Sequence, residues 1–368
     1  MSDHKDYLLK ALQLAAPQRG FCAPNPSVGA VVVKDGEVIG KGFHRGAGFA
    51  HAEVEALNEI TQDVAQQCDL YITLEPCCHY GRTPPCTDLI IEKGLKAVYF
   101  GYADPNPEVA GKGAALLLAQ GIACEKVDVP AINEFYRSYH YWTVSQRPWV
   151  TAKIAMSLDG KIANAGGAPC SITGKALQEL THECRCDSDA ILTTINTVLH
   201  DDPQLNVRLG GGVYKKPVYV LDSKLQLPLE AQIIHASESI TVFHGEKVKK
   251  GQRERLLGMG ISCIQVSANK HGLLWGDILD FIGQAGCHDL WIEAGGRCFS
   301  SLLSQQELNR ALIYLAPKVL GADAHSAFKE PFDLAGQGDV RWKQVGSEVV
   351  CAVDFYNASG EIIPQGIK

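Results

Sequence analysis

The chain has 368 residues, of which 46% are hydrophobic and 20% charged, and its formal net charge is -7. A domain usually takes about 100–200 residues, so this composition is typical of a globular protein with two domains. The acidic balance and the lack of a Lys/Arg block argue against a nucleic-acid groove or an anionic membrane as the main partner, because both need clustered positive charge.

The start of the chain, residues 1–16, has no basic region followed by an apolar run, so we expect no signal peptide. No apolar stretch reaches the roughly 18–20 residues that cross a bilayer. The 13 cysteines are therefore expected to be reduced thiols in a cytoplasmic protein, some of them metal ligands. We expect a small molecule as partner, no nucleic acid or membrane, and a homo-oligomer.

The first half predicts an α/β domain, because segments typical of strands alternate with segments of helical spacing. Asp35-Gly36 between two β-like segments indicates a hairpin turn. The predicted elements are a helix over 7–16, strands over 27–33 and 37–43, a helix over 52–66, a strand over 70–73, a helix over 87–93 ended by Gly94, a strand over 97–102 and a helix over 112–120.

Around Ser145-Gln146-Arg147-Pro148 the pattern is interrupted, and we place the domain boundary there, giving domains 1–146 and 147–368. The second half again predicts strands alternating with helices, with Gly295-Gly296 between a strand and a helix. Its predicted strands are 149–156, 190–194, 217–221, 240–243, 289–293, 312–320 and 349–355, and its clearest helix lies near 298–303.

The strongest chemical signal is His51-Ala52-Glu53, followed by Pro76-Cys77 and by Thr83-Pro84-Pro85-Cys86. His51, Cys77 and Cys86 are the three protein ligands of a zinc site that keeps its fourth position free for water. A structural site would normally close with a fourth ligand, so this open set favours catalysis. Zinc lowers the pKa of its bound water to about 7, which makes hydroxide available at neutral pH.

Glu53 is the predicted catalytic carboxylate of this site. It lies two residues after His51 at a helix start, where it can approach the water without binding the metal. It would take the proton of the water and pass it to a departing amine. Cys86 leads into a helix, whose N-terminus stabilises thiolates.

The order H-x-E, P-C, C is typical of zinc nucleobase deaminases, but here eight residues separate the two cysteines instead of two. This long gap, its ending G-R-T-P-P-C and the segment P-N-P-S-V-G at 24–29 resemble the bifunctional deaminase–reductases of bacterial riboflavin biosynthesis. The resemblance implies a cytidine-deaminase-like three-layer α/β/α domain first and a dihydrofolate-reductase-like α/β domain second.

Several residues near the motif have two interpretations from the sequence. Cys78 and His79 are alternative ligands by position. Asn25, between two prolines, suits either a turn or substrate binding. His44 and Arg82 suit either the substrate pocket, where Arg82 could hold a phosphate, or a solvated loop.

In the second half, the strand that ends at Glu293 and continues into Gly295-Gly296 and a helix suits a phosphate cradle or simply a tight turn. The segments K-x-A-x-S-L-D-G-K at 153–161, D-D-P-x-L-x-V-R at 201–208 and E-A-G-G at 293–296 extend the family resemblance to this half. The resemblance implies a reductase that uses NADPH.

The same resemblance implies roles for individual residues. Arg185 and Arg208 suit the ribose phosphate of the substrate, and Lys153 is the candidate for orienting the substrate or helping proton transfer. The other implied substrate contacts are Pro169, Leu205 and Glu293. The implied cofactor contacts are Ala155, Ile162, Ser171, Thr197, Asp201, Ser223, Gly295, Gly296, Arg297, Cys298, Phe299, Ser300 and Ser301.

One segment departs from the family pattern. The family commonly has a Trp just before an Ile-Thr pair and a Ser two residues ahead of that Trp, whereas this chain has Pro169-Cys170-Ser171-Ile172-Thr173. Packing against the cofactor or the pyrimidine is expected to differ there.

The resulting prediction is a bifunctional enzyme with Zn²⁺ and NADPH as cofactors. It would deaminate 2,5-diamino-6-(5-phosphoribosylamino)pyrimidin-4-one and then reduce the ribosyl group of 5-amino-6-(5-phosphoribosylamino)uracil to ribityl. Two alternatives stay open: a nucleic-acid deaminase of the tRNA adenosine type with an accessory domain, and a zinc-stabilised scaffold without catalysis.

Overall fold

The structure is a computed structural model that describes residues 4–80, 84–167, 170–270, 272–328 and 330–355. It forms two compact units, and the division falls between Gln146 and Arg147. Each unit has its own sheet and its own core. Among the described residues, no helix is long and apolar enough to span a membrane.

The first unit is built on a five-stranded sheet with the order β2-β1-β3-β4-β5. β1 runs antiparallel to β2 and β3, whereas β3, β4 and β5 are parallel. Asp35 and Gly36 both have positive φ in the β1–β2 turn, as the predicted hairpin requires. The strands are β1 (Gly29–Lys34), β2 (Glu37–Phe43), β3 (Asp69–Leu74), β4 (Ala97–Tyr102) and β5 (Ala123–Lys126).

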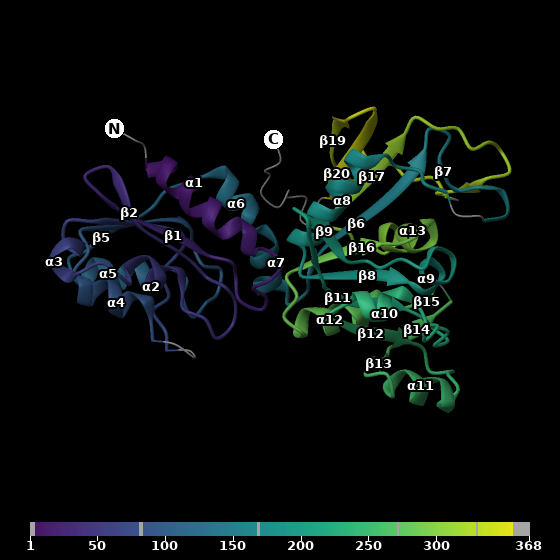
Figure 1. Ribbon diagram of the computed structural model, residues 1–368, viewed down its shortest axis with the longest axis horizontal. Helices are drawn as coiled ribbons and strands as arrows, with labels where there is room; N and C mark the ends of the chain where they lie inside the picture. The colour runs from purple at the N-terminus through teal and green to yellow at the C-terminus, as the bar shows by residue number, and fades with distance from the viewer. Residues whose placement is uncertain (1–3, 81–83, 168–169, 271, 329, 356–368) are drawn as a thin grey trace. The chain divides into compact units, whose positions relative to one another are not determined.

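Helices cover both faces of this sheet (Figure 1). The alternation of side chains along β1 explains the two cores, because Ala30 and Val32 point to one face and Val31 and Val33 to the other. One face packs on α1 (His4–Ala15), α6 (Pro130–Phe135) and α7 (Arg137–Ser145), and the other on α2 (Ala52–Leu57), α4 (Cys86–Lys93) and α5 (Lys112–Ala119). The unit is therefore a three-layer α/β/α sandwich.

The predicted helix over 52–66 is interrupted in the structure. α2 ends at Leu57, and a separate short helix, α3 (Gln62–Ala65), follows. Asn58 stands at the break, and asparagine disfavours a helix interior because its side chain competes for backbone hydrogen bonds. Ile60 is 6% exposed in the intervening turn. Burial of this side chain outweighs continuation of the helix.

The second unit has a nine-stranded sheet with the order β13-β12-β11-β8-β16-β6-β17-β20-β19. The strands from β13 to β17 are parallel, and β20 and β19 are antiparallel. The strands are β6 (Trp149–Ser157), β8 (Ala190–Thr194), β11 (Pro217–Leu221), β12 (Ser239–His244), β13 (Ser262–Gln265), β16 (Asp289–Glu293), β17 (Arg310–Ala316), β19 (Gly338–Val345) and β20 (Glu348–Phe355).

Helices also cover both faces of the large sheet (Figure 1). One face packs on α8 (Lys175–Asp187), α9 (Ile195–Asp201), α10 (Gln232–Ala236) and α11 (Lys250–Leu257), and the other on α12 (Trp275–Gln284) and α13 (Gly296–Ser304). The smaller elements are η1 (Ala16–Gln18), η2 (Ala165–Gly167), and the strand pairs β7 (Lys161–Ala163) with β18 (His325–Ser326), β9 (Val207–Leu209) with β10 (Gly212–Tyr214), and β14 (Ala268–Asn269) with β15 (Gly272–Leu273).

The predicted strand over 312–320 is too long, because β17 ends at Ala316. Pro317 follows, and proline has no N–H to donate to a strand ladder. The sequence pattern also missed β19, α8 and α12. Because the carboxyl ends of parallel strands lie at one edge, residues that follow β6, β8, β11 and β16 are brought to the same edge of the sheet.

Candidate functional site

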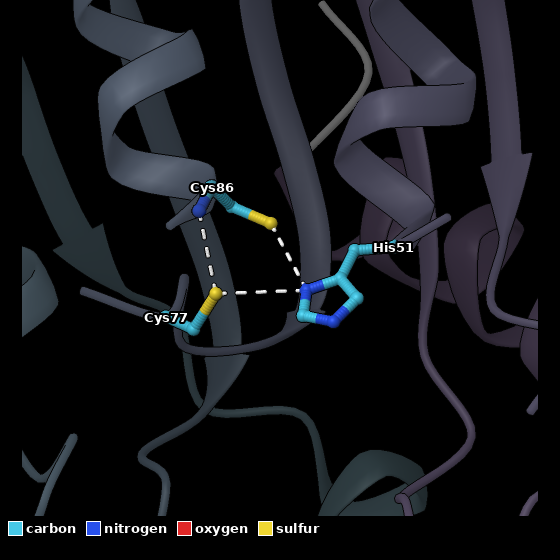
Figure 2. A group of neighbouring side chains, drawn as sticks. All are labelled: His51, Cys77 and Cys86. Atoms are coloured by element: carbon cyan, nitrogen blue, oxygen red, sulfur yellow. Dashed lines mark hydrogen bonds between the residues drawn. The ribbon is translucent and has the colours of Figure 1, made fainter. Parts of the chain in front are cut away.

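The first site lies in the first unit, where three side chains converge from separate elements (Figure 2). His51 precedes α2, Cys77 follows β3, and Cys86 begins α4. Nδ1 of His51 is 3.2 Å from Sγ of Cys86 and 3.5 Å from Sγ of Cys77. The three ligand atoms lie within 4.8 Å of one another, which is the spacing of atoms around a single ion.

The donor set fits zinc. One imidazole and two thiols are ligands that Zn²⁺ prefers, and three protein ligands leave a position for water. The N–H of Cys86, at the start of α4, donates to Sγ of Cys77 at 3.3 Å. Hydrogen bonding from Cys86 and from His51 lowers the pKa of Cys77 to about 4, against the effect of burial. A thiolate is the form that binds a metal.

Glu53 is buried beside this cluster, in the first turn of α2, with 3% of its surface exposed. Burial raises the pKa of Glu53 to about 7. The metal-ligand group found in the described part of the chain consists of His51, Cys77 and Cys86, so Glu53 stands next to the ligands without being one of them.

Asn25 and His44 adjoin the same cluster. Nδ2 of Asn25 is 3.0 Å from Nε2 of His44, and Nδ1 of His44 is 3.0 Å from the carbonyl oxygen of Ala50. The rings of His44 and His51 meet edge-on, with centroids 5.3 Å apart. His44 is 3% exposed, and burial lowers its pKa. These contacts favour the pocket interpretation of His44 over a solvated loop.

The alternative ligands do not join the group. Sγ of Cys78 lies 4.0 Å from the carbonyl oxygen of Glu108, and His79 is absent from the ligand set among the described residues. Arg82 lies outside the described residues. Glu75, just before Pro76, accepts hydrogen bonds from the N–H groups of Gly111 and Ala114, which fixes the chain that leads to Cys77.

The second site lies at the carboxyl edge of the large sheet. Lys153 and Ala155 lie on β6, Glu293 ends β16, and Ser223 follows β11. Among the other residues implied by the family resemblance, Thr197 and Asp201 lie on α9, Ile162 lies on β7, Ser171 lies in an exposed loop, Leu205 follows α9, Arg208 lies on β9, and 295–301 form the start of α13. Pro169 lies outside the described residues.

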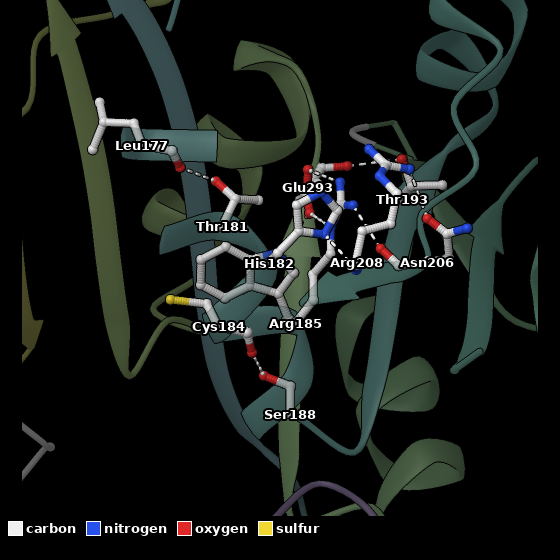
Figure 3. A network of polar contacts seen from close by, with 11 residues as sticks. Leu177, Thr181, His182, Cys184, Arg185, Ser188, Thr193, Asn206, Arg208 and Glu293 are labelled. Carbon is white, nitrogen blue, oxygen red and sulfur yellow. Dashed lines mark hydrogen bonds and ion pairs between the residues drawn. The ribbon is translucent and has the colours of Figure 1, made fainter. Parts of the chain in front are cut away.

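Glu293 is the centre of a polar network (Figure 3). Arg185, on α8, donates from Nε to Oε1 at 2.5 Å and from Nη2 to Oε2 at 3.0 Å. Trp291 adds a third hydrogen bond, from Nε1 to Oε1 at 2.8 Å. Bidentate pairing of this kind is among the strongest side-chain contacts and orients the carboxylate.

The network determines the charge of Glu293. Burial alone would raise its pKa, but Arg185, Lys153 and Trp291 outweigh burial and lower the pKa to about 2. The carboxylate is therefore ionised at neutral pH. Burial lowers the pKa of Lys153, and Glu293 opposes that effect. The site thus combines one buried anion with two nearby cations.

Arg208 is held close to this network through Asn206. Nη1 of Arg185 donates to the carbonyl oxygen of Asn206 at 2.9 Å, and Nη1 of Arg208 donates to Oδ1 of Asn206 at 2.8 Å. Nδ1 of His182 accepts a hydrogen bond from the N–H of Arg208. The two arginines therefore belong to one network, in which Arg185 is already paired with Glu293.

The start of α13 fits a dinucleotide. An added Cβ at Gly295 would meet no atom within 4 Å, so there is open space beside the backbone at the helix start. At Gly296 the Cβ would lie 1.7 Å from the carbonyl oxygen of Ala327, so only glycine fits. A helix N-terminus offers free N–H groups to a phosphate, and these residues therefore suit NADPH.

Sequence reasoning missed four residues of the second site: Trp291, Asn206, His182 and Tyr314. Trp291 lies two residues before Glu293 on a strand and so shares its face, a signal that the alternation of side chains could have supplied. Asn206 lies inside the D-D-P-x-L-x-V-R segment. His182 lies on α8, a helix that was not predicted, and Tyr314 faces Lys153 from another strand.

Known families match both halves of the chain. Residues 1–102 match the cytidine and deoxycytidylate deaminase zinc-binding region, and residues 148–353 match the RibD C-terminal domain. The riboflavin biosynthesis protein RibD of Aquifex aeolicus is 38% identical over 323 residues, covering 86% of this chain and 88% of that protein. RibD of Escherichia coli is 33% identical over 327 residues, covering 86% and 89%.

Solved structures agree with these matches. Acinetobacter baumannii RibD has a TM-score of 0.82 and 31% identity, with 96% of this chain and 99% of that chain covered. A diaminohydroxyphosphoribosylaminopyrimidine deaminase/5-amino-6-(5-phosphoribosylamino)uracil reductase from Thermotoga maritima has a TM-score of 0.82 and 30% identity, covering 96% and 98%. The predicted fold of both halves is confirmed, and the nucleic-acid deaminase alternative is disfavoured.

A zinc-binding deaminase half and a reductase half thus occur together in this chain and in its relatives. The chain belongs to the RibD family and is a bifunctional deaminase and reductase of riboflavin biosynthesis, with zinc and NADPH as its cofactors.

Proposed function

We propose that the chain catalyses two consecutive steps on one metabolite. The first step removes ammonia from 2,5-diamino-6-(5-phosphoribosylamino)pyrimidin-4-one. The second reduces the ribosyl group of 5-amino-6-(5-phosphoribosylamino)uracil to ribityl. The observation that carries the proposal is the presence of an open His/Cys/Cys cluster with a buried Glu53 in one unit and the Arg185–Glu293 network in the other.

In the deamination, His51, Cys77 and Cys86 would hold the zinc. A zinc ion with three protein ligands acts as a Lewis acid that lowers the pKa of water to about 7. Glu53 takes the proton from the attacking water and delivers it to the departing amine, so one carboxyl serves as base and then as acid. Asn25 and His44 bind the pyrimidine at the side of the cluster, supported by their mutual hydrogen bond.

In the reduction, Arg185, Arg208 and Glu293 bind the substrate, with both guanidinium groups suited to its phosphate. Lys153 orients the substrate beside Glu293 and has N–H donors for proton transfer. NADPH supplies the hydride. Gly295 to Ser301 would hold its phosphates, and Ala155, Ile162, Ser171, Thr197, Asp201 and Ser223 would line the rest of its site. Leu205 and Pro169 complete the proposed substrate contacts.

We further propose that residues 1–146 and 147–368 are the two catalytic domains, which is supported by the division of the structure between Gln146 and Arg147. None of the 13 cysteines forms a disulfide, which supports a reducing compartment such as the cytoplasm. We also propose a homo-oligomer. The proposal is supported by Trp342, a large apolar side chain that is 63% exposed on the edge strand β19.

To test the proposal, the zinc-loaded protein is mixed with NADPH and freshly made diaminopyrimidinone ribosyl phosphate. Ammonia release and NADPH absorbance are recorded in the same reaction. We expect ammonia first and NADPH oxidation second, with both rates much lower for the dephosphorylated substrate. Cytidine and a tRNA serve as competing substrates. Ammonia from either of them, with none from the pyrimidinone, would contradict the proposal.

A further inference from the structure

Lys153 has an aromatic neighbour that the proposed mechanism has not used. Its Nζ lies 5.4 Å from the centroid of the Tyr314 ring. β6 and β17 are parallel neighbours, with Lys153 opposite Leu312 and Ala155 opposite Tyr314. Because side chains alternate along a strand, Lys153, Ala155, Leu312 and Tyr314 all share one face. The ring is fully buried, so its position is fixed by the core.

Four groups face the Lys153 ammonium from the surrounding elements. Glu293 on β16 and Asp201 on α9 attract it, whereas Arg185 on α8 repels it. Tyr314 on β17 presents its ring face. None of the described residues accepts a hydrogen bond from Nζ. The ammonium is therefore held by long-range charge and by the aromatic face, and its N–H donors are available to a substrate.

The hydroxyl of Tyr314 is separate from the contact that its ring makes with Lys153. Its oxygen is buried without a well-formed hydrogen bond among the described residues. Thr181 is the polar neighbour of this hydroxyl, and the Thr181 hydroxyl itself donates to the carbonyl oxygen of Leu177. Neither contact involves Lys153, so the ring face is the part of Tyr314 that acts on the ammonium. A cation within about 6 Å of a ring centroid is attracted by the electron density of the face, and more strongly where water is excluded.

We propose that Tyr314 is a positioning residue for the reductase step, whose ring face holds the Lys153 ammonium beside Glu293 with its N–H donors turned to the substrate. This inference rests on the proposed role of Lys153. Tyr314 touches neither the substrate nor the cofactor in this proposal and acts only through Lys153.

The test compares Tyr314→Phe, which keeps the ring, with Tyr314→Leu, which removes it. The full-length, zinc-loaded protein receives already deaminated substrate, so that only the reductase step is measured between pH 6 and pH 10. Tyr314→Phe should stay within about twofold of the wild type, and Tyr314→Leu should lose about 5- to 30-fold in kcat/KM. In the profile of kcat/KM against pH, the fall at alkaline pH should also begin at lower pH in Tyr314→Leu, because the ammonium loses a stabilising neighbour.

A second readout does not depend on turnover. In protein labelled with ¹³C-lysine, the Lys153 signal is assigned by its loss in Lys153→Met and followed by NMR as pH rises. The pKa of Lys153 should be lower in Tyr314→Leu than in the wild type and Tyr314→Phe. Tyr219→Leu is the matched control, because Tyr219 is also buried in this unit but stacks on Phe243.

The outcomes separate the two proposals. Equal behaviour of Tyr314→Phe and Tyr314→Leu in both readouts would overturn the positioning role while leaving the reductase function in place. Absence of NADPH oxidation by the wild type would overturn the proposed function, and the NMR titration would still decide whether Tyr314 holds Lys153. If Tyr314→Leu fails to fold, phenylalanines with increasing fluorination at position 314 keep the shape and should lower the Lys153 pKa stepwise.

Discussion

The zinc-ligand cluster of the first unit and the Glu293 network of the second unit differ in where the partner of their charged groups comes from. In the first unit, the donor atoms of His51, Cys77 and Cys86 converge within 4.8 Å of one another, as the ligands of a metal ion do. In the second unit, the Glu293 carboxylate is already paired with Arg185 at 2.5 Å. The first site is therefore completed by an ion from outside, whereas the second is assembled by the chain itself.

Because of this difference, substitutions in the first site should mainly affect the reaction, whereas substitutions in the second site should also affect the stability of the fold. Loss of the Glu53 carboxylate should damage the reaction but leave zinc binding in place, because Glu53 is not among the three ligands. Loss of Arg185 in the second site removes the bidentate partner of a buried charge, which should destabilise the fold. The predictions below test that contrast, from the largest expected effect to the smallest.

Glu53→Gln should reduce ammonia release by about 10²- to 10⁴-fold, the range expected when a general acid–base group is lost. Zinc content and reduction of already deaminated substrate should stay at wild-type levels, because the ligands and the second unit are unchanged. Metal analysis and the two separate assays measure this. Full deaminase activity in Glu53→Gln would remove the residue from the mechanism.

Arg185→Met should destabilise the second unit by about 3–5 kcal/mol, because it removes the bidentate partner of the buried Glu293 carboxylate. Urea unfolding measures the free energy of unfolding. The control is Lys175→Ala, which breaks an ion pair whose side chains are 89% and 60% exposed and should change stability by less than about 1 kcal/mol. A similar decrease in the free energy of unfolding in both variants would show that burial of the Arg185–Glu293 pair does not increase its effect on stability.

Glu293 should also make stability depend on acid pH. Its folded pKa, about 2, is below the ordinary value of 4.5, so its stabilising contribution is present above pH 4.5 and is lost as pH falls toward 2. The contribution is on the order of 3 kcal/mol. Unfolding followed by urea from pH 6 to pH 3 should show a smaller loss for Glu293→Gln than for the wild type, and parallel curves would argue against the lowered pKa.

Gly296→Ala should cost about 1–3 kcal/mol of stability, because the new Cβ would collide with the carbonyl oxygen of Ala327. Gly295→Ala is the matched control, since its Cβ meets nothing within 4 Å and its φ of -71° is allowed for alanine. Gly295→Ala should keep wild-type stability but weaken NADPH binding, measured by fluorescence titration. Unchanged NADPH affinity would place the cofactor elsewhere.

The same contrast explains how much the sequence could predict. His51, Glu53, Cys77 and Cys86 lie within 36 residues of one another in a local motif, so their ligand chemistry could be recognised from the order and spacing of the residues. The parallel strands 97–102, 190–194, 217–221 and 289–293 were also predicted with the bounds that the structure gives, because each is a short buried run.

The second site could not be built from the residues alone, because its members come from several separate elements around a parallel sheet. Tyr314 looks like an ordinary core residue in the sequence, and only the pairing of β6 with β17 brings it to Lys153, just as the pairing of β16 with β6 brings Glu293 there. Arg185 came from the family resemblance, since α8 was not predicted at all. Long-range pairing of strands decided these contacts, and no local pattern encodes it.

The most direct test of the central contrast is removal of zinc. The chain is treated with a chelator, metal loss is verified, and NADPH oxidation is recorded with the diaminopyrimidinone substrate and, separately, with the already deaminated one. The account predicts that oxidation disappears with the first substrate and continues unchanged with the second. Loss of oxidation with both substrates would contradict it, because the second site would then depend on the metal as well.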